Sequence, residues 1–232
     1  TDTIKQDTVT PVTIDPITVI DGTVPTLTGT GEPGAKIILT IDGVPSDEIT
    51  VGPGGTWTHT PDDPLDASRE IEISANAKDP YGNTNSTGRK IASLVPEDKA
   101  PGDDAHVLVH ESGLPNGSDK DANTESAAST LKIGTSEGGI DHLVIGGATI
   151  TLTQLQDIDS TPITPINTTY GTLTITGYDA ATGTVTYTYA LDANKTHTAS
   201  GQDILREDIQ IAVVDNNGDT RVGKIVAGVV DD

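Results

Sequence analysis

Short apolar runs separated by turn residues fill most of this chain, and they restrict it to a sheet structure. In residues 8–94 about seven such runs occur, among them "AKIILTI" and "EIEISANA". Between the runs stand segments such as "GEPG", "DGVPSD" and "DPYGN". Glycine supplies positive φ in such turns and proline fixes φ. This spacing of runs and turns is typical of a β-sandwich.

A second set of runs covers residues 106–232. Its clearest hairpin is "GTLTITGYDAATGTVTYTYAL", in which apolar residues face one side and threonines the other. The apolar face consists of Leu173, Ile175, Val185, Tyr187 and Tyr189. The stretch "TLTQLQDID" is the one place where we expect a short helix. Residues from about 140 to 168 exceed what a minimal sandwich needs, so we expect an insertion in this unit.

The stretch "PEDKAPGDDA", residues 96–105, interrupts the apolar pattern with two prolines and four acids. Such a composition is typical of a short, stiff linker. We therefore expect a first domain at 1–95, a linker at 96–105 and a second domain at 106–232. The predicted fold class is all-β, with two tandem Ig-like β-sandwich domains and the second enlarged by the insertion.

The composition supports an all-β fold with an unusual core. The chain has no Phe and no Met, one Trp and five Tyr, so Ile, Val, Leu and Ala must fill its interior. Threonine is the commonest residue, with 37 copies, and β-branched side chains favour strands over helices. The absence of cysteine excludes disulfide bonds, so an extracellular chain of this kind needs another way to hold its loops.

The formal net charge of −22 excludes two classes of partner. It would repel the phosphates of nucleic acid and an anionic membrane surface alike. The aspartates suit turns, and they also suit calcium, which binds hard oxygen ligands. The sequence shows no signal peptide and no apolar run of about 18 residues, and it reads as an excised segment of an exported protein.

The two halves share one local pattern. "IEISANAKDPYGNT" and "IQIAVVDNNGDT" both show an alternating strand followed by Asp-x-x-Gly-[Asn/Asp]-Thr. With Asp79 aligned on Asp215, the inward positions of the two strands also coincide. We interpret the two units as related sandwiches in tandem.

Strand counting places the loop between the last two strands at the same end as the N-terminus of the domain. We therefore expect five carboxylates to converge on one seam and to bind Ca²⁺ there, namely Asp103, Asp104, Glu111, Asp215 and Asp219. The same reasoning groups four acids at the far end of the first unit, Asp79, Glu32, Asp2 and Asp7. Asp231 and Asp232 are expected where the second unit would meet a successor. As an alternative, "DNNGD" is a polar hairpin turn that needs no ion.

Other chemistry finds little support in the sequence. The loop after Asp215 lacks the glycine and glutamate positions of an EF-hand. His106 and His110 lie about 13 Å apart along a strand, too far to share one ion, and we expect hydrogen-bonded or solvent-facing roles for His59, His142 and His197. Nucleophile, phosphate-loop and metalloprotease motifs are absent, and aromatic residues are too scarce, at 3%, for a sugar-binding cleft. We expect no enzymatic activity.

Two long stretches resemble repeats of bacterial surface proteins. "VTIDPITVIDGTVPTLTGTGEPGAKIILTIDG" with "ISANAKDPYGN" resembles the bacterial Ig-like repeats of giant adhesins. "GTLTITGYDAATGTVTYTYAL" with "EDIQIAVVDNNGDTRVGKIVAGVVDD" resembles the cadherin-like or VCBS-like repeats of large RTX adhesins exported by type I secretion. Together the resemblances cover nearly the whole chain.

The resemblance implies calcium-rigidified extender domains in the stalk of a Gram-negative adhesin, which supports cell attachment and biofilm formation. It implies that the calcium ligands are Glu111, Asp215, Asp219, Asp231 and Asp232. The partners expected are neighbouring repeats of the same polypeptide, with the fragment itself a monomer at the cell surface. The alternative is a ligand-binding module that recognises a glycan or a protein through the second domain.

Overall fold

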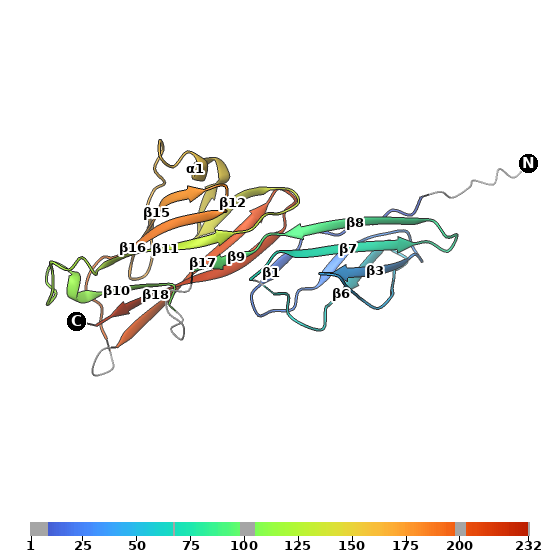
Figure 1. Ribbon diagram of the computed structural model, residues 1–232. Helices are drawn as coiled ribbons and strands as arrows, with labels where there is room; N and C mark the ends of the chain where they lie inside the picture. Colours follow the sequence, from blue (N-terminus) through green and yellow to red (C-terminus); the bar gives the residue numbers. More distant parts are fainter. Residues whose placement is uncertain (1–8, 67, 98–104, 198–202, 232) are drawn as a thin grey trace, which may run out of the picture.

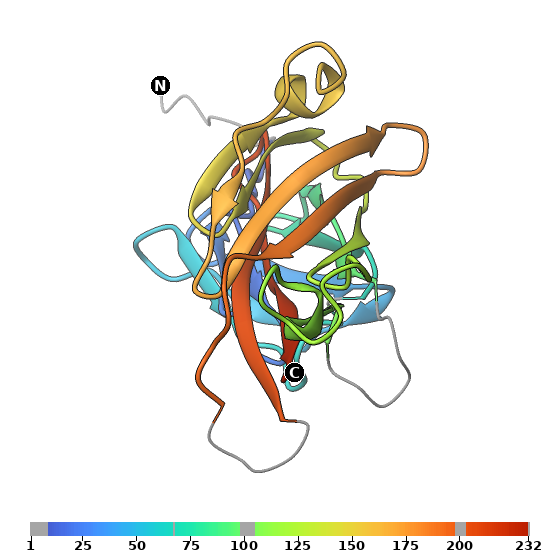
Figure 2. The same ribbon diagram turned by 90° about the vertical axis from the view of Figure 1, so that its left-hand side faces the viewer.

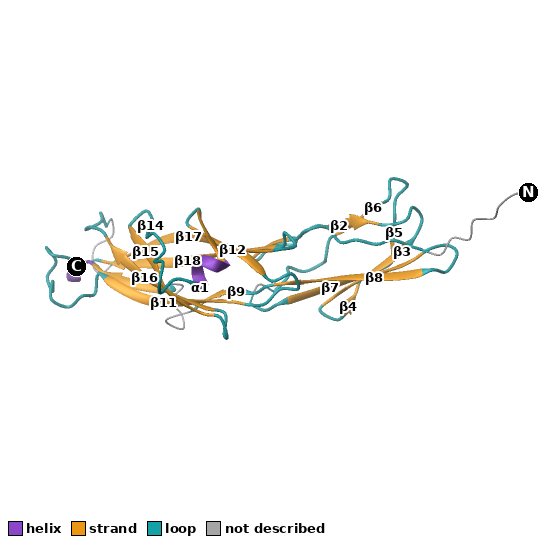
Figure 3. Cartoon of the chain, turned by 90° about the horizontal axis from the view of Figure 1, so that it is seen from above, coloured by secondary structure: helices purple, strands orange, loops and turns teal. Residues whose placement is uncertain are grey.

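The chain forms two β-sandwich units that lie end to end (Figures 1 and 3). The computed structural model describes residues 9–66, 68–97, 105–197 and 203–231. Each unit has its own buried apolar cluster. The predicted fold class, two tandem Ig-like β-sandwiches with the second enlarged, is confirmed.

The first unit packs a two-stranded sheet, β2–β6, against a larger one with the order β4–β3–β7–β8, in which β5 also pairs with β3. Trp57 lies buried between them, and its indole N–H donates to the Thr30 carbonyl at 3.2 Å. The strands of this unit are β1 (Thr18–Ile20), β2 (Leu27–Thr30), β3 (Lys36–Ile41), β4 (Val44–Pro45), β5 (Ile49–Thr50), β6 (Thr56–His59), β7 (Ile71–Lys78) and β8 (Thr84–Ile91).

The second unit, which faces the viewer in Figure 2, packs two sheets against each other. One has the order β1–β18–β17–β12–β13 and the other the order β14–β15–β16–β11–β9. A further strand, β10, pairs with β18. Its elements are β9 (Leu94–Pro96), β10 (Val107–His110), the 3₁₀ turn η1 (Glu111–Gly113), β11 (Ser126–Ile133), β12 (Ile140–Ile145), β13 (Ala148–Thr151), α1 (Leu152–Gln156), β14 (Ile166–Asn167), β15 (Gly171–Asp179), β16 (Thr184–Leu191), β17 (Ile204–Asp215) and β18 (Thr220–Val230).

The predicted hairpin at residues 171–191 is formed by β15 and β16. Its two strands pair Leu173 with Tyr189 and Ile175 with Tyr187, and all four side chains are buried in the second core. The alternation of apolar and threonine residues puts one face on the core because side chains point to opposite faces of a strand in turn.

The expected insertion at residues 140–168 forms β12, β13, α1 and β14. The helix begins with a capping box between Thr151 and Gln154. Six apolar side chains of the segment are buried in the second core, Leu143, Ile145, Ile150, Leu155, Ile158 and Ile166. The insertion therefore completes the sandwich rather than standing apart from it.

The expected domain boundary differs from the structure. β9, expected in the first domain, pairs with β11 of the second unit, and Leu94 lies in the second core. Only Ala92 and Ser93 separate β8 from β9, so the chain passes from one unit to the other with almost no linker.

The acidic stretch at 96–105 therefore connects two strands of the second unit rather than two domains. Residues 98–104 lie outside the described part of the chain. On one side of them, the Glu97 amide donates to the Thr130 carbonyl at 2.9 Å; on the other, Ala105 is buried. The prolines and charges of residues 96–105 are typical of a linker, but composition alone does not distinguish a connection between domains from a loop within one.

Candidate functional site

The repeated Asp-x-x-Gly motif forms the same turn in both units. In each, the first aspartate donates its amide to the carbonyl of the fifth residue at 3.0 Å, from Asp79 to Asn83 and from Asp215 to Asp219. Its Oδ1 accepts from the amides of the third and fifth residues, at 2.8 or 2.9 Å in every case. The glycine of each turn has positive φ, 95° and 82°, which explains why glycine stands there.

The fifth residue makes the two turns different. In the first unit, Asn83 Nδ2 donates to Asp79 Oδ2 at 2.6 Å, so this turn satisfies its own carboxylate. Burial opposes the ionisation of Asp79, but the hydrogen bonds from Asn83 and the neighbouring amides outweigh it, and the pKa of Asp79 lies below its usual value. In the second unit an ionised Asp219 cannot donate, and Asp215 Oδ2 is buried without a hydrogen-bond partner in the described part of the chain.

Asp219 instead contacts the first unit. Its Oδ1 accepts from the Ile17 amide at 2.7 Å, and its Oδ2 pairs with Arg89 Nη1 at 3.0 Å. Arg89 also donates to the Ile14 carbonyl through Nε and Nη2. Burial raises the pKa of Asp219 above its usual value, although the Ile17 amide and the Arg89 guanidinium act in the opposite direction.

Strand pairing continues across the joint. β1 of the first unit pairs in parallel with the start of β18, Thr18 opposite Thr220 and Ile20 opposite Val222. β10 pairs with the far part of the same edge, from Ala227 to Val230. One edge of β18 is thus shared by a strand of each unit, which removes an exposed edge.

Arg221 lies between the two units and is 1% exposed. Its Nε donates to the Ala92 carbonyl at 3.2 Å, and its Nη2 reaches the Arg69 carbonyl at 3.5 Å. Burial lowers the pKa of the guanidinium, an effect that carboxylates of the first unit partly oppose. Each unit therefore contributes an arginine to the joint.

A third contact joins Glu70 of the first unit to the second. Its Oε1 accepts from the Thr135 amide at 2.7 Å and from the Thr135 hydroxyl at 2.6 Å, while its Oε2 pairs with Lys90 at 2.6 Å. Lys90 and then Thr135 lower the pKa of Glu70 from 4.5 to about 2. The joint thus consists of backbone pairing, two arginines and a hydrogen-bonded glutamate.

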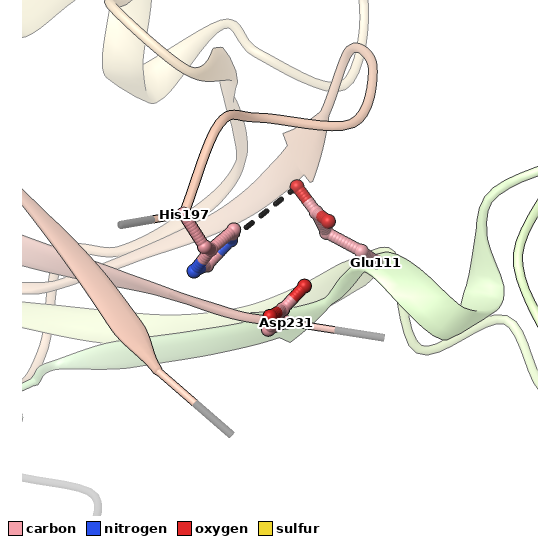
Figure 4. Close-up of side chains that lie close together, drawn as sticks. All are labelled: Glu111, His197 and Asp231. Atoms are coloured by element: carbon pink, nitrogen blue, oxygen red, sulfur yellow. Dashed lines mark ion pairs between the residues drawn. The ribbon is translucent and has the colours of Figure 1, made fainter. Parts of the chain in front are cut away.

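Glu111, His197 and Asp231 form a cluster where β10 and β18 end, at the end of the second unit away from the joint (Figures 1 and 4). One ligand-type atom from each side chain lies within 4.8 Å of the others. His197 Nε2 is 3.6 Å from Glu111 Oε1, and His197 Nδ1 is 3.8 Å from an oxygen of Asp203. The Lys195 amide donates to Glu111 Oε1.

The expected seam of five carboxylates is wrong in its arrangement. Asp215 and Asp219 lie at the joint, whereas Glu111 lies at the opposite end of the second unit with Asp231. The reason is that β10 runs parallel to β18, with His110 opposite Val230, so the residue after β10 lies beside the end of β18. The expected seam requires a second domain that begins with β10, whereas this domain begins with β9.

The remaining predicted ligands divide into two groups. Five lie outside the described residues, Asp2, Asp7, Asp103, Asp104 and Asp232. Asp79 and the segment that holds Glu32 do fall at the far end of the first unit, because Lys36 pairs with Lys78. The oxygens of Asp79 accept hydrogen bonds within their own turn.

Both oxygens of Asp219 accept from protein donors, one of which is an arginine. The cluster at Glu111 offers carboxylate oxygens together with an imidazole. That donor set differs from the all-oxygen sets that calcium prefers.

Sequence reasoning missed Arg89, Arg221 and Glu70 at the joint and expected a different role for His197. Each of the four contacts residues far away along the chain, and no local pattern marks them. The one usable signal was that Arg221 occupies an apolar β-type run. His142, in contrast, has the expected hydrogen-bonded role, since its Nδ1 lies 2.8 Å from Asp141 Oδ2.

No family model and no curated protein matches the chain. Among solved structures, it is similar to one described under host-cell surface retention of a 1.5-MDa bacterial ice-binding adhesin, with 14% identity, a TM-score of 0.28, and coverage of 98% of this chain and 66% of that one. It is also similar to the tandem Ig repeats of Dlar, with 13% identity, a TM-score of 0.29, and coverage of 96% and 97%. At these identities and TM-scores the likeness carries no functional argument. None of the helices in the described part of the chain has the length and hydropathy of a membrane-spanning helix.

Proposed function

We propose that this chain is a two-domain spacer segment of a bacterial surface adhesin, whose role is to hold neighbouring domains in a fixed end-to-end arrangement. The observation that carries the proposal is the joint. Strand β1 extends the sheet of the next unit, and Asp219 accepts from both Ile17 and Arg89 across the boundary. A chain that needed freely moving domains would gain nothing from such contacts.

The short connection supports the same role. Only two residues separate β8 from β9, so the units cannot swing on a flexible tether. The net charge of −22 keeps such a segment monomeric and away from nucleic acid and anionic membranes. In this proposal the partners of the segment are neighbouring repeats, and it lies at the cell surface after type I secretion. It serves attachment and biofilm formation and catalyses no reaction.

Small-angle scattering of the purified chain tests the fixed joint. We expect the scattering profile of the wild-type chain to fit one extended shape, with a narrow distribution of maximum dimensions. Arg89→Gln removes the ion pair across the joint and should broaden that distribution. Lys36→Gln is the matched control, because Lys36 pairs with Glu48 on the exposed face of the first unit. A wild-type profile that already requires many interdomain angles would overturn the proposal.

Calcium is a separate part of the proposal, with the resemblance as its support. The resemblance assigns calcium to Glu111 and Asp231, which lie in one cluster, and to Asp215 and Asp219, which lie in one turn. Thermal unfolding in a chelator and in a calcium series tests this, since an ion that binds the folded state alone raises Tm. A Tm that does not change with calcium would remove calcium from the proposal and leave the spacer role intact.

A further inference from the structure

The imidazole of His197 is buried without a hydrogen-bond partner in the described parts of the chain. Its side chain is 4% exposed, and neither ring nitrogen has a hydrogen-bond partner in the described parts of the chain. Burying a polar group without a hydrogen bond is costly, and native proteins rarely do so without a reason. The ring faces carboxylates on both sides. Nε2 faces Glu111, as Figure 4 shows, and Nδ1 lies 3.8 Å from an oxygen of Asp203.

The distances suit a shared ion better than direct hydrogen bonds. His197 Nε2 and Glu111 Oε1 are 3.6 Å apart, which is longer than a normal hydrogen bond. Two ligands bound to one tetrahedral zinc ion at about 2.1 Å each would lie about 3.4 Å apart. An oxygen of Asp231 completes the group within 4.8 Å. These three side chains can therefore surround one ion after small adjustments.

The backbone holds the three ligands in place. Glu111 follows β10 and Asp231 follows β18, and the parallel pairing of His110 with Val230 sets these two carboxylates side by side. The Lys195 amide donates to Glu111, which ties the segment carrying His197 to the same point. The Asp231 amide donates to the Asp203 carbonyl at 3.1 Å. The cluster is thus assembled from four segments of the fold.

We propose that Glu111, His197 and Asp231 bind a first-row transition-metal ion, with zinc as the first choice, and that this cluster prefers it to calcium. Imidazole nitrogen is a ligand of zinc, copper and nickel, whereas calcium takes oxygen ligands. His197 Nε2 would bind the ion while Nδ1 faces Asp203 at 3.8 Å, and the same small adjustments would let Nδ1–H donate to that carboxylate, as is usual for a metal-bound histidine. This inference takes Glu111 and Asp231 out of the calcium proposal, because zinc would replace calcium at this cluster, and it does not depend on the spacer role.

Titration of the untagged, chelator-treated chain with Co²⁺ and Zn²⁺ tests the inference. Co²⁺ should give one visible absorption band typical of four-coordinate nitrogen and oxygen ligation, and one equivalent of Zn²⁺ should abolish it. A hundredfold excess of Ca²⁺ should not. Zn²⁺ should also raise Tm, and His197→Gln should remove that rise.

His197→Gln should weaken Zn²⁺ binding at least tenfold and remove the Co²⁺ band. His142→Gln is the matched control, because His142 belongs to the same unit but is partly exposed and pairs with Asp141. Asp231→Asn provides a second test if His197→Gln does not fold, as judged by circular dichroism, and should also weaken Zn²⁺ binding tenfold or more.

Two results would overturn the inference. One is Zn²⁺ binding that His197→Gln leaves unchanged. The other is a chain that binds Ca²⁺ as tightly as Zn²⁺, or binds neither. A Ca²⁺-specific rise in Tm would support the calcium proposal and contradict the zinc inference, so the two failures are distinguishable. The spacer role is measured separately by scattering.

Discussion

The turns at residues 79–83 and 215–219 share one backbone and differ in their fifth side chain. In the first turn, the amide of Asn83 closes the hydrogen bonding of Asp79 within the turn. In the second, Asp219 turns away from Asp215 to the neighbouring unit and accepts from Ile17 and Arg89. The same local structure is therefore self-contained at one end of the first unit and forms a joint in the second.

The next strand shows the same difference. Two residues beyond each turn, the first unit has the exposed Asn85, and the second has the buried Arg221. The second turn takes part in the joint because Asp219 stands where the first unit has Asn83, and Arg221 stands where it has Asn85. The distinction depends on two side chains, and the backbone of the turn does not change.

The largest effect is expected at Arg221. Arg221→Ala removes a fully buried side chain with its donors to Ala92 and Arg69, and it should lower the free energy of unfolding by about 2–3 kcal/mol. Asn85→Ala, at the equivalent exposed position, should change it by less than about 0.5 kcal/mol. Urea unfolding followed by Trp57 fluorescence and by circular dichroism measures both. Equal effects of the two changes would contradict the comparison.

Exchanging the fifth residue tests the comparison directly. Asp219→Asn gives the second turn the amide of the first, so its Nδ2 can donate to Asp215 Oδ2 while the ion pair with Arg89 is lost. We expect the fold of each unit to persist, the joint to loosen in scattering, and stability to change by about 1 kcal/mol or less, because gain and loss partly cancel.

The reverse exchange, Asn83→Asp, has no such compensation. It removes the donor to Asp79 Oδ2 and places a second carboxylate beside the first. The first unit should lose about 1–2 kcal/mol of stability at neutral pH, measured by Trp57 fluorescence during unfolding. Recovery of that loss as the pH falls toward 4 would identify the repulsion between carboxylates as its cause, and a loss independent of pH would argue against it.

The smallest effect concerns Glu70, whose folded pKa of about 2 lies below its unfolded value near 4.5. A carboxyl with a lowered folded pKa contributes stability that is complete above pH 4.5 and is lost as the pH falls toward 2. A third of the side chain is exposed, so solvent screening limits the contribution to about 1 kcal/mol. Glu70→Gln should remove this part of the pH dependence. An unchanged acid-unfolding curve would show that the charge of Glu70, beside Lys90 and Thr135, does not stabilise the fold.

Local patterns predicted much of the fold. The alternation in residues 171–191 specified the β15–β16 hairpin and its buried face, and the short helix formed in "TLTQLQDID". Each of these depends on side chains that are close in sequence. The repeated Asp-x-x-Gly motif likewise identified two equivalent turns, because the aspartate satisfies the amides that follow it.

The joint and the cluster could not be predicted in the same way. The position of Glu111 depends on β10 running parallel to β18, which is a pairing between residues more than a hundred positions apart. The domain boundary failed because an acidic, proline-containing segment looks alike within a domain and between domains. Neither feature leaves a periodic trace in the sequence.

The parallel pairing of β1 with β18 has a mechanical consequence. If the two units were pulled apart along their common axis, β1 and β18 would slide past one another, and their hydrogen bonds would be loaded together in shear rather than opened one at a time. The register of Thr18 with Thr220 through Ile20 with Val222 would then have to fail as a whole. The joint would resist tension along the axis more than it resists bending.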